Sequence, residues 1–388
     1  MAERFGSYQN EIYLQGYGGT KPAFSTDPTR LEASAAELLA PEPFWYVAGA
    51  AGSGATARAN REAFDRWRIV PRMLTDATER DLSTSVLGTT MPAPVLLAPV
   101  GVQSIVHADA EPATARAAAG LGLPMVLSTA SSTSIEDVAA ASGSGPRWFQ
   151  LYWPNDPDVC GSILCRAKRA GYSVLVVTLD TWTLAWRPCD LDAGYLPFLH
   201  GEGMAVPFSD PVFRSRLDTS PEEDTPSAVL RWISMVTGTD RAWDALPFLR
   251  EHWDGPIVLK GIQHVDDARR AVAAGMDGIV VSNHGGRQVD GAIAALDALP
   301  EIATAVGDRI EVLFDSGVRT GADVLKALAL GARAVLLGRP YVYGLAHGGE
   351  DGVRHVLRSV LADFDLTMGL SGHRTVAELG AATLRRAG

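Results

Sequence analysis

The segment from residue 282 to residue 288, Ser-Asn-His-Gly-Gly-Arg-Gln, holds the side chains whose types and spacing point most directly to chemistry. It follows residues 278–281, a short β-branched run that is typical of a buried strand. His284 could exchange a proton near neutral pH, and Arg287, three residues later, could bind a carboxylate. Two glycines between them allow a tight turn. The pattern indicates proton transfer on a small acid, although a loop histidine and a surface arginine are the commoner fate of such residues.

Apolar runs that alternate with helical patterns must position this segment. They cover residues 95–99, 125–129, 148–152, 174–180, 257–260, 278–281, 312–315 and 334–338. Helices are expected at 110–119, from 134, at 158–170, 266–274 and 322–330. Eight runs of this kind predict parallel strands with crossover helices, and they favour an α/β fold of the (β/α)8 TIM barrel type. A doubly wound sheet fits less well, because no run is followed by a G-x-G-x-x-G phosphate turn.

The remaining segments predict additions to a single domain that spans residues 1–388. Residues 1–92 form an N-terminal cap with a helix at 31–40, residues 93–345 form the barrel, and residues 346–388 form C-terminal helices. Residues 181–250, after the fourth run, are far longer than an ordinary connection. We expect them to be an inserted loop that covers the mouth of the barrel, with one helix near 227–236.

Composition narrows the classes of partner. The chain has 388 residues, 47% of them hydrophobic and 20% charged, as in a soluble globular protein. Its net charge of −11 argues against nucleic acid and anionic membranes as partners. Its three cysteines lack metal-ligand spacing, so we expect reduced thiols and no metal site. Without a signal pattern or a long apolar window, a cytoplasmic location is expected.

Polar residues end seven of the eight apolar runs. In such a barrel the carboxyl ends of the strands meet at one face, where catalytic groups gather. A buried polar group without a partner costs about 1–3 kcal/mol, so this coincidence indicates a site. Glycine and arginine follow the last two runs, in Gly317-Val318-Arg319 and Gly338-Arg339, and predict a phosphate site. The residues at the ends of the runs are Pro99, Ser128, Gln150, Tyr152, Thr178, Asp180, Lys260, Ser282, His284, Asp315, Gly338 and Arg339.

Segment 282–288, with Leu259-Lys260-Gly261 before it and residues 314–321 after it, resembles the FMN-dependent L-2-hydroxy acid oxidase and dehydrogenase family. Within that family, the chain is most similar to the lactate 2-monooxygenases, through the motifs at residues 8–13, 71–74, 180–182, 186–188, 210–213 and 260–264. The resemblance implies an FMN enzyme that uses O2 to convert L-lactate into acetate, carbon dioxide and water. It also implies a homo-oligomer, either a tetramer or an octamer.

The resemblance further implies roles for individual residues. His284 would take a proton from the α-carbon or from the hydroxyl of the substrate, and Asp180 would hold the imidazole. Arg187 and Arg287 would bind the substrate carboxylate together with Tyr46, while Tyr152 would bond the substrate oxygen. Lys260 would stabilise the reduced flavin. The cofactor-binding residues would be Pro99, Val100, Gly101, Ser128, Gln150, Thr178, Lys260, Ser282, Asp315, Ser316, Gly317, Arg319, Gly338 and Arg339.

Each role has a simpler alternative. Asp180 could pair with a lysine of the barrel, Arg187 could stack on Trp186, and Tyr152 could merely fill space. We expect Gly101 to leave more room beside the flavin than alanine would. The competing functions are an oxidase that releases the 2-oxo acid and hydrogen peroxide, a quinone-linked dehydrogenase, and a non-catalytic flavin-binding protein.

Overall fold

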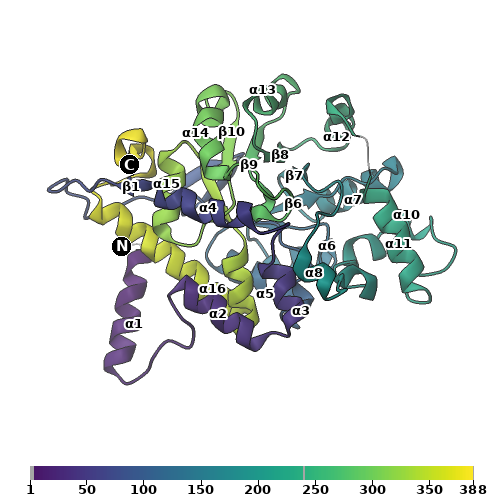
Figure 1. The fold of residues 1–388 in the computed structure, drawn as a ribbon, viewed down its shortest axis with the longest axis horizontal. Helices are drawn as coiled ribbons and strands as arrows, with labels where there is room; N and C mark the ends of the chain where they lie inside the picture. Colours follow the sequence, from purple (N-terminus) through teal and green to yellow (C-terminus); the bar gives the residue numbers. More distant parts are fainter. Residues whose placement is uncertain (1–3, 239–240, 388) are drawn as a thin grey trace.

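Eight parallel strands close into a barrel in the computed structural model, which describes residues 4–238 and 241–387 (Figure 1). Each strand pairs with its neighbours along the chain, and β11 pairs with β4 to complete the ring. The predicted (β/α)8 barrel is therefore confirmed. The strands are β4 (Val95–Leu97), β5 (Met125–Leu127), β6 (Arg147–Leu151), β7 (Leu175–Thr178), β8 (Ile257–Ile262), β9 (Gly278–Val281), β10 (Glu311–Phe314) and β11 (Ala334–Leu337).

Both faces of each strand are buried, which is why the strands have no alternation of polar and apolar residues. Alternate residues such as Leu96 and Val126 pack inside the barrel. Their neighbours Leu97 and Leu127 pack outward against the helices. A hairpin of β2 (Thr84–Val86) and β3 (Thr89–Met91) closes the amino-terminal end, because Val86 and Met91 join the inner cluster. The polar ends of the strands are therefore left at the opposite face.

The crossover helices agree closely with the sequence prediction. They are α5 (Ala110–Gly120), α6 (Ile135–Ser142), α7 (Pro157–Arg169), α12 (Leu246–His252), α13 (Val265–Ala273), α14 (Ala295–Val306), α15 (Gly321–Ala329) and α16 (Arg339–Leu370). Side chains cap several amino termini; Ser134 accepts a hydrogen bond from the backbone of Asp137, for example. We did not predict α12 or α14, and the pattern of α14 is interrupted by Pro300. α16 begins directly after β11, and its backbone is not helical at Gly348 and Gly349, so the last crossover helix and the C-terminal helix meet there at a kink.

The N-terminal segment wraps around one side of the barrel. It contains η1 (Phe5–Ser7), α1 (Tyr8–Tyr17), α2 (Pro28–Leu38), α3 (Pro41–Ala48), α4 (Ala55–Asp65) and β1 (Trp67–Ile69). α1 projects from the body of the molecule (Figure 1). After α16 the chain forms η6 (Val376–Glu378), η7 (Ala381–Thr383) and β12 (Leu384–Arg386), and β12 pairs with β1.

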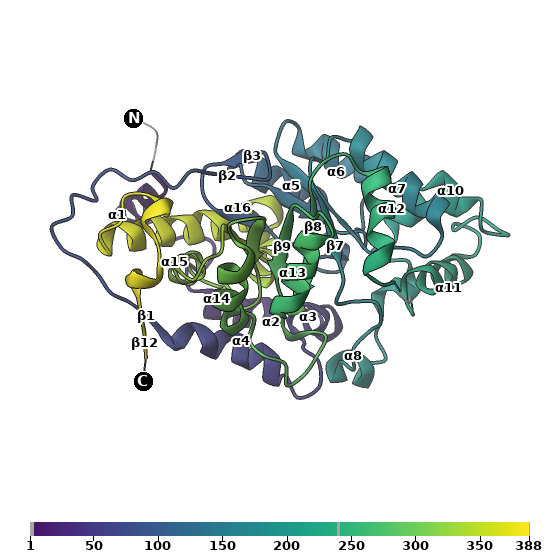
Figure 2. The same ribbon diagram turned by 90° about the horizontal axis from the view of Figure 1, so that it is seen from above.

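Residues 181–250 form a chain of short helices rather than an irregular loop. They are α8 (Pro188–Asp192), η3 (Pro197–His200), α9 (Ala205–Phe208), α10 (Pro211–Arg214), α11 (Thr225–Val236) and η4 (Trp243–Ala245), followed by the start of α12. α8, α9 and α10 have only four or five residues each, which is too short to produce a periodic pattern. α10 and α11 lie at one end of the molecule in Figure 2. None of the helices in the described residues is long and apolar enough to cross a membrane.

Candidate active site

A cavity of about 220 Å³ opens at the carboxyl ends of the barrel strands. Sixteen of the twenty predicted site residues line it. They are Tyr46, Pro99, Val100, Gly101, Ser128, Tyr152, Arg187, Lys260, His284, Arg287, Asp315, Ser316, Gly317, Arg319, Gly338 and Arg339. The other four, Gln150, Thr178, Asp180 and Ser282, lie behind this lining. The polar residues at the strand ends and the residues implied by the family resemblance, which are far apart in the sequence, therefore meet at one cavity.

His284 begins the short helix η5 (His284–Gly286) and has a left-handed backbone, with φ of 58°. A histidine seldom adopts this conformation, so the surrounding contacts must hold it. The preceding Asn283 accepts a hydrogen bond from the backbone N–H of Gly286. Its amide also exchanges two hydrogen bonds with Asn60 of α4, at 2.7 and 2.8 Å. The hydrogen bonds of Asn283 with Gly286 and Asn60 thus fix the turn that presents the imidazole of His284.

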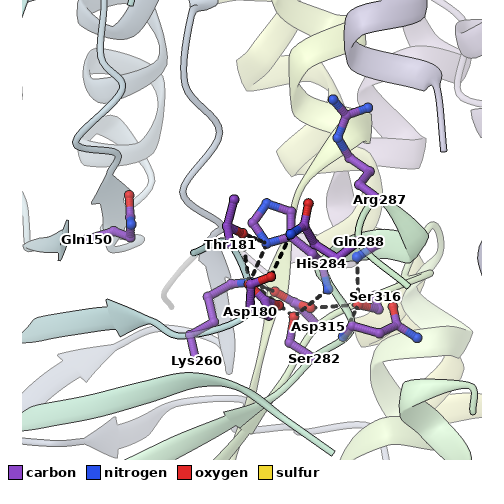
Figure 3. A network of polar contacts seen from close by, with 12 residues as sticks. Gln150, Asp180, Thr181, Lys260, Ser282, His284, Arg287, Gln288, Asp315 and Ser316 are labelled. Carbon is purple, nitrogen blue, oxygen red and sulfur yellow. Dashed lines mark hydrogen bonds and ion pairs between the residues drawn. The ribbon is translucent and has the colours of Figure 1, made fainter. Parts of the chain in front are cut away.

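Asp180 holds the imidazole of His284. Its Oδ1 lies 2.9 Å from His284 Nδ1, and Thr181 Oγ1 lies 3.2 Å from the same nitrogen (Figure 3). Burial acts to raise the pKa of Asp180, but the interactions with His284 and then Lys260 dominate and lower it to about 2. Burial is the largest effect on His284 and lowers its pKa below the ordinary value. At neutral pH the aspartate is therefore ionised and the imidazole is neutral, with Nδ1–H donating and Nε2 able to accept a proton.

Lys260 pairs with a different carboxylate. Its Nζ lies 3.0 Å from Asp315 Oδ2 and donates a hydrogen bond of 3.0 Å to Ser282 Oγ. Burial acts to lower the pKa of Lys260, but Asp315 and then Asp180 offset that effect and raise it. Lys260 is therefore a buried cation at the end of β8. The alternative in which a lysine is the main partner of Asp180 does not hold.

Two arginines, Arg187 and Arg287, line the cavity together with His284. Arg187 Nε donates to the carbonyl oxygen of Arg287 at 3.1 Å, and Arg187 Nη2 donates to Gln288 Oε1 at 2.8 Å. Arg287 Nη1 donates to the carbonyl oxygen of Gly49 at 2.9 Å, and its guanidinium lies 5.4 Å from the ring centre of Tyr46. Arg187 is buried whereas the Trp186 side chain is 74% exposed, so stacking on Trp186 is not what holds Arg187.

Two further arginines, Arg319 and Arg339, lie after β10 and β11. The guanidinium of Arg339 donates to the carbonyl oxygens of Val47, Gly285 and Gly49 at 2.8–3.0 Å. Within the described residues, the Arg319 guanidinium makes a single hydrogen bond, from Nη1 to the carbonyl oxygen of Val318 at 3.1 Å. Burial and then Arg339 lower the pKa of Arg319 to about 10, and burial and then Arg187 lower the pKa of Arg287 to about 9. Guanidinium groups that repel one another in this way favour the binding of anions.

Gln150 keeps a buried donor without a partner in the described residues. Its Oε1 accepts hydrogen bonds from Ser128 Oγ and from the backbone N–H of Thr129, both at 3.1 Å. Its Nε2 is buried and makes no hydrogen bond there. An unpaired buried amide is costly, and in a binding site it indicates an acceptor supplied by a ligand.

Most of the chain matches a known family. The model of the FMN-dependent dehydrogenase family matches residues 35–386. The chain belongs to that family. It is 53% identical to an FMN-dependent alpha-hydroxy acid dehydrogenase of Penicillium citrinum, over 98% of this chain and 96% of that protein. It is 42% identical to an L-lactate oxidase of Lysinibacillus sphaericus, over 91% of each. A crystal structure of mandelate oxidase superposes with a TM-score of 0.82 at 38% identity, over 93% of this chain and 98% of that one.

The cofactor of this FMN-dependent enzyme is therefore FMN, and the residues present suit it. Arg319 and Arg339 provide positive charge for a phosphate near the start of α16. The unpaired Nε2 of Gln150 and the ammonium of Lys260 suit a ring with acceptor atoms along its edge. The site thus has groups that suit the phosphate of FMN and groups that suit the polar edge of its ring.

Gly101 lies close to the loop after β5, and the expectation that it leaves room beside the flavin stays a prediction. A Cβ added at this residue would lie 2.6 Å from the carbonyl oxygen and 2.8 Å from the Cβ of Ala130. It would therefore collide with the neighbouring loop. Glycine is required because the loops after β4 and β5 approach closely.

Sequence reasoning missed several residues of the FMN-dependent enzyme's site. Thr181 directly follows Asp180 and lines the cavity, so its place in the sequence could have identified it. Gln288 binds Arg187 and also donates to the carbonyl oxygen of Asp180 at 2.6 Å. The apolar wall contributed by residues 181–250 gave no signal. Its members are Leu184, Leu196, Phe198, Trp232, Ile233 and Val236.

Proposed function

We propose that this chain oxidises an L-2-hydroxy acid to the 2-oxo acid, with FMN as the electron acceptor and His284 as the base. The observation that carries the proposal is the His284–Asp180 pair, 2.9 Å apart, on a cavity that Arg187 and Arg287 also line. A base and two carboxylate-binding cations in one cavity match the two polar ends of a 2-hydroxy acid.

The arginines and two tyrosines position the substrate in this proposal. Arg187 and Arg287 bind its carboxylate, and the hydroxyl of Tyr46, which lies beside Arg287, adds a hydrogen bond. Burial and the nearby Tyr46 raise the pKa of Tyr152 to about 12. Tyr152 therefore stays protonated and donates a hydrogen bond to the substrate oxygen.

His284 moves the proton in this proposal. Its Nε2 accepts a proton from the hydroxyl or from the α-carbon, and Asp180 stabilises the imidazolium that forms. Bound FMN supplies the two-electron acceptor. Lys260, a buried cation at the end of β8, would stabilise negative charge on the reduced FMN.

We further propose that O2 is the second substrate and that the 2-oxo acid is decarboxylated before it leaves. For L-lactate, the net reaction is lactate plus O2 to acetate, carbon dioxide and water. Two observations support product retention: the lactate 2-monooxygenase motifs of the sequence, and the helical insertion that contributes to the wall of the cavity. The competing outcome is release of the 2-oxo acid together with hydrogen peroxide.

Aerobic turnover of L-lactate by purified FMN-loaded protein separates these outcomes, with acetate, pyruvate and peroxide all measured. Acetate without free peroxide supports the monooxygenase reaction. Pyruvate and peroxide in equal amounts would contradict the monooxygenase reaction and support the oxidase reaction. Turnover of other L-2-hydroxy acids but not of lactate would keep the oxidation and exclude lactate as the substrate.

The proposal also includes a cytoplasmic homo-oligomer, either a tetramer or an octamer. Sequence resemblance supports the oligomer, and the free thiols of Cys160, Cys165 and Cys189 suit a reducing compartment. Light scattering on the purified FMN-loaded protein tests the oligomeric state, and a monomeric mass would contradict it.

A further inference from the structure

The cavity has an apolar side that the roles proposed above leave unused. The insertion lines this side with Leu184, Leu196, Phe198, Trp232, Ile233 and Val236. Among the described residues of the insertion, the only charged one in the lining is Arg187, and the two lining hydroxyls already donate to protein acceptors. Thr181 Oγ1 donates to Asp180 Oδ1 at 3.0 Å, and Thr237 Oγ1 donates to the carbonyl oxygen of Ile233 at 2.7 Å. This wall therefore presents hydrocarbon to whatever occupies the space beside it.

The order of strands around the barrel assigns that space to the substrate. The arginines and glycines suited to the FMN phosphate follow β10 and β11, whereas the insertion follows β7. In the closed ring, β7 lies opposite β11, with three strands between them on either side. Figure 2 shows the same separation, with α15 toward one end of the molecule and α11 at the other. The phosphate end of the cofactor is therefore far from the apolar wall.

The apolar wall continues from the carboxylate-binding residues. The ring of Phe198 meets the ring of Tyr46 edge to face, with centroids 6.4 Å apart, and Tyr46 in turn contacts Arg287. A hydroxy acid held by Arg187 and Arg287 therefore has Phe198 within reach, and beyond it the residues of α11.

α11 is fixed in place, so the wall has a defined shape. The backbone N–H of Asn155, after β6, donates to the carbonyl oxygen of Met235 at 2.7 Å. The N–H of Gly238 donates to the carbonyl oxygen of Trp182 at 2.9 Å. Trp232 packs edge to face against Phe213 of α10, with ring centroids 5.6 Å apart. These anchors tie the helix to the barrel and to the rest of the insertion.

We infer that the preferred substrates are L-2-hydroxy acids with an uncharged apolar side chain larger than the methyl group of lactate. The inference rests on the proposed function and specifies the substrate class of the same site. A methyl group would leave most of this wall without a partner, whereas a longer alkyl or an aromatic side chain would cover it. A carboxylate on the side chain would enter a region whose hydroxyls are already engaged.

The test is a series of L-2-hydroxy acids on the purified FMN-loaded protein, from lactate to 2-hydroxyoctanoate, with bleaching of the flavin absorbance followed without O2. The second-order rate constant should rise about fourfold for each methylene that the wall covers. L-malate should be far slower than its near-isostere L-2-hydroxy-4-methylpentanoate. Lactate as the best substrate, or malate equal to its isostere, would overturn the inference and leave the proposed function standing. No reduction by any acid would overturn the proposed function itself.

Ile233→Trp adds bulk to the wall and should lower the ratio of the 2-hydroxyoctanoate rate to the lactate rate at least tenfold. The matched control is Leu230→Trp on the same helix, where the side chain is 59% exposed and outside the cavity, and the ratio should not change. Ile233→Ala is the second variant, in case the larger side chain prevents folding. Ile233→Ala should shift the chain length of the best substrate toward longer acids. An unchanged ratio in a folded, FMN-loaded Ile233 variant would contradict the inference.

Discussion

His284 combines an unusual backbone conformation with a neutral imidazole. Its φ of 58° depends on Asn283 and Asn60, which lie in segments far apart in the sequence. Its Nδ1 is held by the ionised Asp180, so the proton-accepting nitrogen is Nε2. The arrangement places a weak base, already oriented, in a cavity lined by arginines.

Replacement of the base tests its role directly. His284→Gln should lower the rate of flavin reduction by about 10²–10⁴-fold, because no other group at that position could accept the proton. FMN binding should be retained, since the cofactor is held by other residues. Rapid mixing with substrate without O2 measures the rate, and the absorbance of bound flavin provides the control. Full turnover by the variant would favour a non-catalytic role for His284.

The dependence of activity on pH follows from the same pair. The rate constant for reduction at low substrate concentration should fall as pH drops through the pKa of His284, which burial holds below the ordinary value. Because Asp180 raises the pKa of His284, Asp180→Asn should move this acid limb to still lower pH. The variant should also react more slowly, since it cannot stabilise the imidazolium. A limb that moves to higher pH, or does not move, would contradict the assignment.

At the scale of elements, the barrel and the one long helix of the insertion, α11, could be predicted from sequence, and the short helices of the insertion could not. Strands such as β9 have apolar residues on both faces, so each gives a continuous signal. α9 and α10 contain four residues each and are held by contacts with distant segments, such as the hydrogen bond from Ala205 N–H to the carbonyl oxygen of Ser131. Asp180 was found because it ends a strand. Ile233 was not, because its role depends on where α11 packs.

The loops after β4 and β5 approach closely at Gly101 and Ala130, and a substitution there tests this packing. Gly101→Ala should destabilise the protein by about 1–3 kcal/mol, because the new methyl group would overlap the carbonyl of Ala130 and one loop must move. Denaturant unfolding of the FMN-loaded protein measures the change. Gly380→Ala is the matched control, because a Cβ there would meet nothing within 4 Å and the backbone is extended, with φ of −169°. Equal stabilities of the two variants would contradict the packing explanation.

At the scale of the whole molecule, the charge distribution is uneven. The chain carries a net charge of −11, yet Arg187, Arg287, Arg319 and Arg339 all line one cavity. Neighbouring cations and burial lower the pKa values of Arg287 and Arg319. The protein without cofactor therefore holds positive charges that repel one another, and an anionic ligand relieves the repulsion.

Removal of FMN should therefore lower the melting temperature, and added FMN should restore it far better than riboflavin, which lacks the phosphate. Arg319→Leu should narrow the difference between FMN and riboflavin. It should also raise the melting temperature of the cofactor-free protein, because it removes a cation that burial disfavours. Arg30→Leu is the control, since that side chain is 82% exposed. Equal effects of FMN and riboflavin on the unsubstituted protein would contradict a phosphate site here.

The pairing of β1 with β12 has a consequence for local unfolding. Ile69 pairs with Leu384, so closing this small sheet joins segments from opposite ends of the described chain. Such a closure forms late and opens early, because a sheet of two three-residue strands must offset the entropy cost of joining distant segments. α4 directly precedes β1 and carries Asn60, which supports the His284 turn. Gentle warming should therefore expose the β1 and β12 amides to hydrogen exchange and impair catalysis while the barrel strands stay protected.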